Sequence, residues 1–491
     1  MMHMHKNSCR ISKPLFLLSA LILGVLLGTS LVHATKGAEL EAEAAEAKKA
    51  TGAKKTVPSP IASVQKTGEK EDHPETSFDF KGDMKTRFHF RNDSDFDPSE
   101  RFDDLDGQTD AQLATFFQPT LTARPGGGVT ARYQLVVGWN AWSRNDPGQP
   151  NQFFNVNTPG LVARHTQAWA QWRGDRLKLR AGFQQVKDPT GLFLNHTMGA
   201  VTAQLPLGTQ RLTLIAGQLP ETTIEGLDIR QDNLMTDSFV FGITHRAQLS
   251  RASRLDTGVY LLHDRRLIGR VLNLGAGAVN WRMSTSSMTA WAGLVGQYGQ
   301  WSNAALGGGD VTHSSFAAHA GVQGRSGKLQ WGVGSFALSA DDDFDGNEVQ
   351  GAFFGAAKNQ SPSVFLTEDE ERDRYDNLDE RLGSYWGAFA FSPAGVSVSD
   401  LMVGYQVTSW LTSRLVAASA FTLNAKRSYG ASYVGTELSL LQKLTLSERA
   451  SLSLNALVFL PGEAGAAMIN DLDRTATQIL YGGSTSFAVS F

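Results

Sequence analysis

The chain has 491 residues, of which 41% are hydrophobic and 19% are charged, and its formal net charge is −3. The hydrophobic content excludes a disordered chain, and the near-neutral balance gives no support to nucleic-acid binding by the whole chain. The only cysteine is Cys9, which excludes a disulfide scaffold and a cysteine-rich zinc site.

Residues 1–34 are typical of a secretory signal peptide. Basic residues precede the apolar run 15–27, and a small-x-small cleavage pattern follows at 32–34. A retained membrane anchor is the alternative, but the apolar run is shorter than the ~20 residues that a spanning helix needs. Residues 35–76 are of low complexity and predict a disordered or partly helical periplasmic tether.

From Ser77 to Arg91, apolar and charged side chains alternate. A helix would spread both kinds over all its sides, so this segment is predicted as a strand with one apolar face. The chain ends with the same alternation. A last strand that ends on an aromatic residue is similar to the C-terminal assembly signal of bacterial outer-membrane barrels. The residues of this predicted signal are Tyr481, Phe487, Val489 and Phe491.

Long polar connections alternate with tight turns along the rest of the chain, as in an up-and-down membrane barrel. The strands are predicted at 77–91, 111–124, 129–142, 162–173, 176–185, 200–206, 210–218, 238–249, 254–263, 271–283, 288–299, 313–324, 328–339, 399–408, 412–424, 431–443, 450–460 and 479–491. This parity requires one long outer connection, 340–398, in which 383–398 is no spanning strand. The fold class is therefore all-β, a transmembrane antiparallel barrel 77–491 of 18 strands. Sixteen strands is the alternative, because 200–206 and 210–218 are short.

The strand face opposite the apolar one is predicted to line the lumen. In the first five strands this face is rich in basic residues, and basic rings in a pore favour anions. The predicted basic wall consists of Lys81, Lys85, Arg87, Arg91, Arg132, Lys178 and Arg180. Arg124 and Arg176 are predicted at the periplasmic rim. Arg164 is assigned to the lipid face, because it has the parity of Ala168.

The connection 340–398 is acidic, and its start matches half of a calcium loop. Asp341, Asp343 and Asp345 alternate ahead of a glycine, an arrangement that suits Ca²⁺. Ala352 stands where the motif has its closing glutamate, so a solvated acidic loop is the competing interpretation. No other cofactor is expected.

The sequence has no nucleophile elbow, metal-spaced histidine pair or phosphate loop. The triplet Asn195-His196-Thr197 is interpreted as part of an exposed loop. We therefore predict no catalytic residue and expect a protein that is not an enzyme. The alternatives from other classes are a barrel-embedded hydrolase, whose residues would meet only on folding, and a structural or adhesive barrel.

Two stretches resemble the alginate-export group of outer-membrane barrels. In residues 172–184, a turn leads into a strand that ends Arg-Ala-Gly-Phe-Gln, with Phe183 where that group usually has a basic residue. Residues 399–463 include a Gly-Thr-Glu strand start at 435–437 and a Phe-x-Pro-Gly-acidic strand end at 459–463. The resemblance implies an 18-stranded monomeric barrel with an arginine-rich lumen for anionic polysaccharide. It does not fix the solute, because the group holds many barrels of unknown cargo.

Together these features predict a porin-like channel in the outer membrane of a Gram-negative bacterium, with both termini in the periplasm. Small or polymeric solutes, preferably anionic, would diffuse through it passively. The expected partners are outer-membrane lipid and lipopolysaccharide, the barrel assembly machinery and the anionic solute, and no nucleic acid. A monomer is favoured, and a trimeric anion-specific porin is the alternative within this class.

Overall fold

The described residues of the computed structural model all fall in the compact unit Asp72–Phe491. They are residues 76–91, 110–139, 162–218, 238–265, 271–302, 309–341, 349–355, 362, 395–426, 430–469 and 477–491. The predicted signal peptide 1–34 and the tether 35–76, apart from its last residue, lie outside them.

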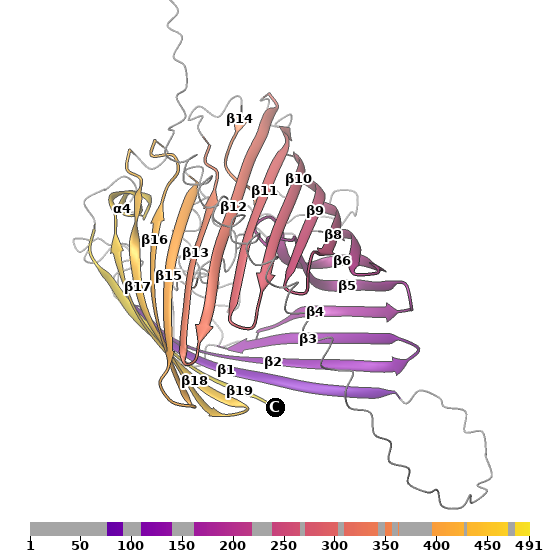
Figure 1. The fold of residues 1–491 in the computed structure, drawn as a ribbon, viewed down its shortest axis with the longest axis horizontal. Helices are drawn as coiled ribbons and strands as arrows, with labels where there is room; N and C mark the ends of the chain where they lie inside the picture. Colours follow the sequence, from indigo (N-terminus) through magenta and orange to yellow (C-terminus); the bar gives the residue numbers. More distant parts are fainter. Residues whose placement is uncertain are drawn as a thin grey trace, which may run out of the picture. The chain divides into compact units, whose positions relative to one another are not determined.

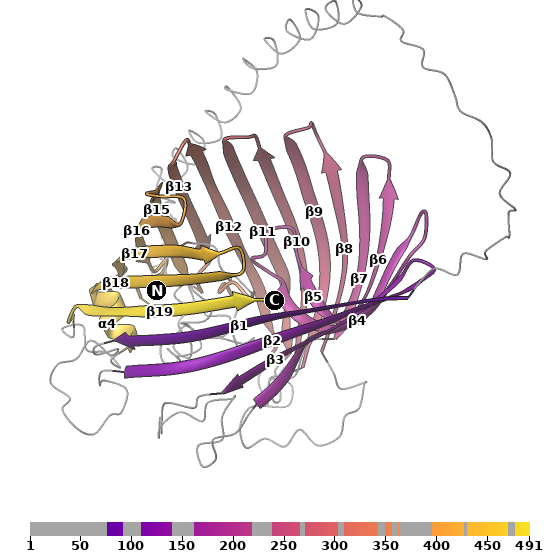
Figure 2. The ribbon, with the colours of Figure 1, turned by 90° about the horizontal axis from the view of Figure 1, so that it is seen from below.

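Nearly all of the described chain forms one antiparallel sheet (Figure 1). Its long strands are β1 Ser77–Arg91, β2 Asp110–Gly126, β3 Val129–Trp139, β4 Val162–Arg173, β5 Lys178–Lys187, β6 Asn195–Leu207, β7 Gln210–Gln218, β8 Phe239–Gln248, β9 Ser253–Asp264, β10 Val271–Ser284, β11 Met288–Ser302, β12 Val311–Ser326, β13 Leu329–Leu338, β15 Val396–Gln406, β16 Leu411–Phe421, β17 Tyr433–Ser447, β18 Ala450–Pro461 and β19 Leu480–Ser490. Each pairs with the next in the chain, and β1 pairs with β19, so the sheet closes into a barrel (Figure 2).

Two short elements complete the described structure. The two-residue strand β14 (Val349–Gln350) pairs in parallel with β12, and helix α4 (Glu463–Ile469) lies between β18 and β19 in the chain. Among the described residues, no helix is long and apolar enough to cross a membrane.

The structure confirms the predicted all-β barrel of 18 spanning strands. β13 pairs directly with β15, so the connection 340–398 adds no spanning strand between them. Most predicted strand boundaries differ from the observed ones by a few residues, and two of these differences bear on the strand count and on the long connection. β15 begins at Val396, inside the predicted connection 340–398. β6 begins at Asn195, inside a predicted loop, so it has 13 residues and the argument for 16 strands no longer applies.

The triplet Asn195-His196-Thr197 is likewise strand rather than exposed loop. Its backbone pairs with residues 185–187 at the end of β5. The interpretation failed because the polar triplet carries no alternation of its own, whereas the ladder with β5 supplies backbone hydrogen bonds that a local pattern does not reveal.

The outer face of the barrel carries the large apolar side chains. Phe78, Phe241 and Val259 are 70%, 52% and 65% exposed, and they alternate with residues that face inward. Strand residues point to opposite sides of a sheet with a period of two. The apolar outer surface therefore suits lipid, while polar and charged residues of the same strands lie on the lumen side.

The C-terminal residue closes the seam between β1 and β19. Phe491 exchanges two backbone hydrogen bonds with Gly82, at 2.9 and 3.0 Å, and its ring stacks on Phe117 with centroids 5.9 Å apart. The ring also covers Gly82, where a Cβ would lie 2.4 Å from it. Tyr481 and Phe487, from the predicted assembly signal, are exposed on the same outer face, and Val489 pairs with Met84 across the seam.

We expect Gly82→Val to destabilise the closed barrel, because the new side chain would displace the Phe491 ring. Overpacking of this kind costs about 1–3 kcal/mol. Urea unfolding of the protein in detergent measures the free energy of unfolding. Gly277→Val is the matched control, because Gly277 lies on a strand of the same sheet but is exposed, and nothing stands within 4 Å of its Cβ position. Equal stability of the two variants would contradict this account of the seam.

Candidate functional site in the barrel lumen

The connection between β5 and β6, residues 188–194, folds into the barrel and is called here the constriction loop. Pro189 accepts a hydrogen bond of 2.8 Å from Asn280 Nδ2 on β10. A Cβ at Gly293 on β11 would lie 3.0 Å from Thr190. The ring of Phe193 packs 5.6 Å from that of Tyr260 on β9. The loop therefore lies against the inner wall of β9, β10 and β11, where a glycine gives it room.

Asp188 organises the constriction loop through its buried carboxylate. One oxygen accepts hydrogen bonds from the backbone and hydroxyl of Thr190, at 2.8 and 2.5 Å. The other accepts from the backbone of Phe193 and Leu194, at 3.1 and 2.8 Å. Burial raises the pKa of Asp188 above its ordinary value, and the hydrogen bonds from Thr190 and Leu194 oppose that shift. Four donors on one side chain fix the loop in one conformation.

A second segment, residues 349–355, also lies inside the barrel and is called here the inner segment. The side-chain amide of Gln297 on β11 makes two hydrogen bonds with the backbone of Phe354. Its Nε2 donates to the carbonyl oxygen at 2.6 Å, and its Oε1 accepts from the amide nitrogen at 3.1 Å. The ring of Phe354 packs edge-on against Trp301. A Cβ at Gly355 would lie 2.6 Å from the carbonyl oxygen of Leu192. The inner segment and the constriction loop therefore touch and narrow the lumen together.

We expect Asp188→Asn to loosen the constriction loop, because an amide nitrogen cannot accept hydrogen bonds from the donors that now converge there. Unsatisfied buried groups cost about 1–3 kcal/mol. Hydrogen exchange of a peptide covering 188–194 should accelerate about tenfold. Asp175→Asn, in the exposed turn after β4, makes the same chemical change elsewhere and should leave that peptide unchanged. Unaltered exchange in Asp188→Asn would contradict the role given to this carboxylate.

A cavity of about 620 Å³ lies beside the constriction loop, and Asp188, Pro189 and Thr190 of that loop line part of it. It is lined by arginines from five strands. This arginine cluster consists of Arg180, Arg211, Arg246, Arg254 and Arg282. The acidic residues that line the same cavity are Asp188, whose carboxylate is satisfied within the loop, and Asp256. The cavity thus has a large surplus of positive charge.

Like charges face each other directly across neighbouring strands of this wall. The register pairs Arg173 with Lys178, Arg211 with Arg246, and Arg254 with Arg282. Directly opposed like charges destabilise a sheet. Asp256 offsets part of this repulsion, because it forms ion pairs with Arg246 at 2.5 Å and with Arg254 at 3.2 Å. No ion pair involving Arg173, Lys178 or Arg211 is present in the described part of the chain.

The structure distributes the predicted basic wall over two places. Arg132, Lys178 and Arg180 lie on β3 and β5, and only Arg180 lines the cavity. Lys81, Lys85 and Arg87 lie on β1, outside it. Lys81 is 3.6 Å from Asp79, and Arg87 is buried. The side chain of Arg91 lies outside the described residues.

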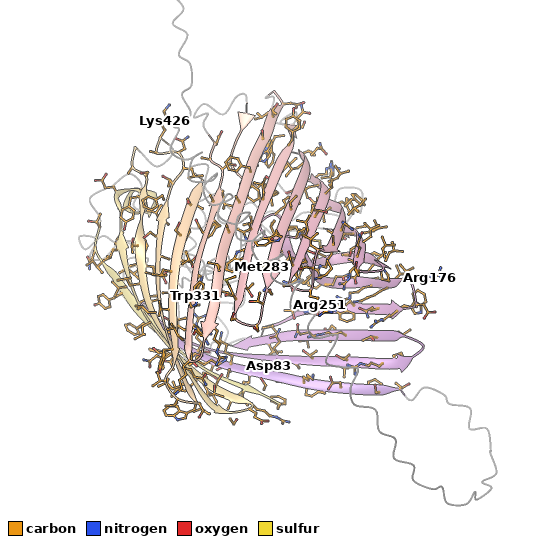
Figure 3. The ribbon with its side chains drawn as sticks, viewed as in Figure 1. Asp83, Arg176, Arg251, Met283, Trp331 and Lys426 are labelled. Atoms are coloured by element: carbon orange, nitrogen blue, oxygen red, sulfur yellow. The ribbon has the colours of Figure 1, made fainter. Side chains whose placement is uncertain are left out.

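The two predicted rim residues lie at the turn end of the barrel. Arg124 is exposed near the end of β2, just before the turn at 126–128, and Arg176 is exposed in the turn after β4. Figure 3 labels Arg176 at the end of the hairpin formed by β4 and β5.

Sequence reasoning missed four of the five clustered arginines because the alternation was followed only through the fifth strand. The signal was present in β7 to β10. Leu214, Phe241, Val259 and Val279 are exposed on the outer face. Side chains alternate between the two faces of a strand, so the missed arginines, an odd number of positions from these exposed residues, face the lumen. They are Arg211, Arg246, Arg254 and Arg282.

Two acidic residues on the lumen side of strands outside the arginine cluster were also missed. Asp400 on β15 and Glu437 on β17 are buried, and both pair in register with Ala418 of the strand between them. Their positions alternate with the exposed residues Leu401 and Leu438, so they are on the lumen side.

The predicted calcium loop falls mostly outside the described residues, which include Asp341 but not Asp343 or Asp345. Asp341 is buried, its carboxylate accepts a hydrogen bond from the backbone of Gly351, and its carbonyl oxygen accepts one from Asn424. These contacts give Asp341 a structural role at the start of the connection. Within the described part of the chain, no group of three or more acidic, histidine or cysteine residues is arranged to hold a metal.

No family model and no curated protein matches this sequence. Solved structures with the same fold include OccK9 (OpdG) of Pseudomonas aeruginosa, at a TM-score of 0.56 and 10% identity over 84% of this chain and 98% of that one. OccAB4 of Acinetobacter baumannii matches at a TM-score of 0.52 and 10% identity, over 85% of this chain and 99% of that one. The outer membrane protein OpdK of P. aeruginosa matches at a TM-score of 0.51 and 11% identity, over 84% of this chain and 98% of that one. A further structure of OpdK, with vanillate, matches at a TM-score of 0.51 and 13% identity over the same shares of the two chains.

Proposed function

We propose that this chain is a passive channel of the bacterial outer membrane that prefers anionic solutes. The observation that carries the proposal is the set of like-charged pairs on one lumen wall, Arg173 with Lys178, Arg211 with Arg246, and Arg254 with Arg282. Such pairs reduce the stability of the sheet, and a negatively charged solute in the lumen would offset that cost. Basic residues that line a pore favour anions.

The width of the lumen favours small solutes over polymers. The constriction loop and the inner segment touch inside the barrel, and a cavity of about 620 Å³ has the size of sites for small molecules. Vanillate, which OpdK holds in one of its structures, is a small anion and illustrates the class. Anionic polysaccharide, which the resemblance to the alginate-export group implies, is the second candidate and would require both lumen segments to move.

The same proposal places the protein in its membrane. An even number of spanning strands puts both chain ends on one side, and short turns on the periplasmic side would put the termini in the periplasm. Residues 1–34 would direct export, and the aromatic C-terminal strand would be the signal for the barrel assembly machinery. The apolar outer face would contact lipid and lipopolysaccharide. Passage by diffusion needs no catalytic residue or cofactor.

Reversal potentials in planar bilayers under a potassium chloride gradient test the proposal. We expect chloride to permeate better than potassium in the wild type, and a preference for potassium would contradict the proposal. The double variant Arg211→Gln, Arg282→Gln removes one charge from each of two like-charged pairs. It should lower the chloride preference about twofold or more.

The same double variant should be more stable than the wild type, because each like-charged pair on a sheet costs about 0.2–1 kcal/mol. Urea unfolding in detergent measures the gain. A loss of stability would show that these arginines hold the wall together rather than strain it.

We propose a monomer, which is what the resemblance to the alginate-export group implies. Mass measurement of the detergent-solubilised protein should give one chain of 53.2 kDa, less any cleaved signal. A stable trimer after crosslinking would favour the alternative porin architecture.

A further inference from the structure

Arg180 differs from the other clustered arginines in how its side chain is held. Its guanidinium lies over the ring of Trp169, with Cζ 4.2 Å from the ring centroid. Gln171 Oε1 accepts hydrogen bonds from its Nε and Nη2, at 3.2 and 2.8 Å. Both holding residues come from β4, which pairs with β5 so that Gln171 stands directly opposite Arg180.

The ring that supports Arg180 is itself fixed. Trp169 Nε1 donates a hydrogen bond of 3.1 Å to Gln167 Oε1. Gln167, Trp169 and Gln171 alternate along one strand, so all three face the lumen. A guanidinium over an aromatic face is attracted by the charge distribution of the ring, so the contact restricts where the end of Arg180 can move. The Trp169 ring contacts the face of the Arg180 guanidinium and Gln171 contacts its edge, whereas Arg246 forms an ion pair with Asp256.

A count of donors shows what this arrangement leaves available. A guanidinium has five N–H donors in one plane. Gln171 uses the Nε–H and one hydrogen of Nη2, so the end of the group keeps one hydrogen on Nη2 and two on Nη1. The remaining Nη2 hydrogen and one of the Nη1 hydrogens form a fork of two parallel N–H groups, the geometry that carboxylates and other planar oxyanions accept. The described residues supply no ion pair to Arg180, and Arg180 lines the cavity.

We propose that Arg180, held in place by Trp169 and Gln171, is a specificity-determining residue of the lumen that favours planar oxyanions over spherical anions of equal charge. Chloride would feel the positive charge of the wall but could not accept two parallel hydrogen bonds in one plane. Acetate and nitrate could accept both. This inference rests on the proposed anion channel and adds to it a choice among anions.

The test measures the permeabilities of acetate and nitrate relative to chloride, from bi-ionic reversal potentials of potassium salts, each corrected for mobility in water. Arg180→Lys keeps the charge but replaces the fork by a point charge. We expect both oxyanion-to-chloride ratios to fall about three- to tenfold, which is the size of effect that the net loss of one hydrogen bond in a hydrated site implies. The preference for chloride over potassium should stay, because the net charge of the wall is unchanged.

Two further variants keep Arg180 but remove one of its supports. Trp169→Leu removes the aromatic ring under the guanidinium, and Gln171→Ala removes the acceptor of its Nε and Nη2 hydrogen bonds. Each should lower both oxyanion-to-chloride ratios. Either variant suffices if the other does not fold. Arg251→Lys makes the same exchange in the exposed turn between β8 and β9, labelled in Figure 3, and should leave the ratios unchanged.

Unchanged ratios in Arg180→Lys, or an equal fall in Arg251→Lys, would overturn the inference. Failure of the proposed function would be seen elsewhere, as a wild-type preference for potassium over chloride. The two ideas are therefore judged on separate measurements.

Discussion

The pairing of β1 with β19 is the constraint on which the rest of the structure depends. In an apolar phase no water satisfies a free strand edge, so the sheet must close and every spanning strand needs two partners. Closure leaves one face for lipid and one for the lumen, and strand side chains alternate between them. Charged residues of the spanning strands are therefore directed inward. The seam itself is sealed by Phe491, whose ring lies over Gly82 and whose backbone bonds to it.

A closed ring of this size leaves an interior that strand side chains alone do not fill. The constriction loop and the inner segment fill part of it, and each brings backbone groups that must be satisfied away from bulk water. Asp188 satisfies the backbone of the first, and Gln297 that of the second. The apolar side chains of both segments, such as Phe193 and Phe354, are buried. The cavity with the arginine cluster lies next to the constriction loop, which supplies part of its lining.

Alternation predicted the strands because the lipid face imposes a period of two on the sequence itself. It predicted Arg132, Lys178 and Arg180 on the lumen side for the same reason, and it would have given Arg211 and Arg282 had the count been extended. It fails where the register slips. A bulge between Gln134 and Leu135 interrupts the count on the pairing of β3 with β4. The side chain of Arg164, which was assigned to the lipid face by parity, lies outside the described residues. The constriction is beyond local patterns, because Pro189 and Asn280, which hold it, are 91 residues apart in sequence.

On the arginine wall, the stability of the sheet and the proposed preference for anions oppose each other. Arg211 and Arg246 share one register position on adjacent strands of a closed sheet, so their backbones cannot move apart. Asp256 relieves the repulsion on one side of Arg246 but leaves Arg211 facing the cavity. In a ring of 18 strands, β15 and β17 lie nine places from β5 and β7, so Asp400 and Glu437 stand across the lumen from the basic wall. Under the proposed function, charge of opposite sign on opposite walls would draw an anion toward the arginines, where its binding would offset the repulsion that the register imposes.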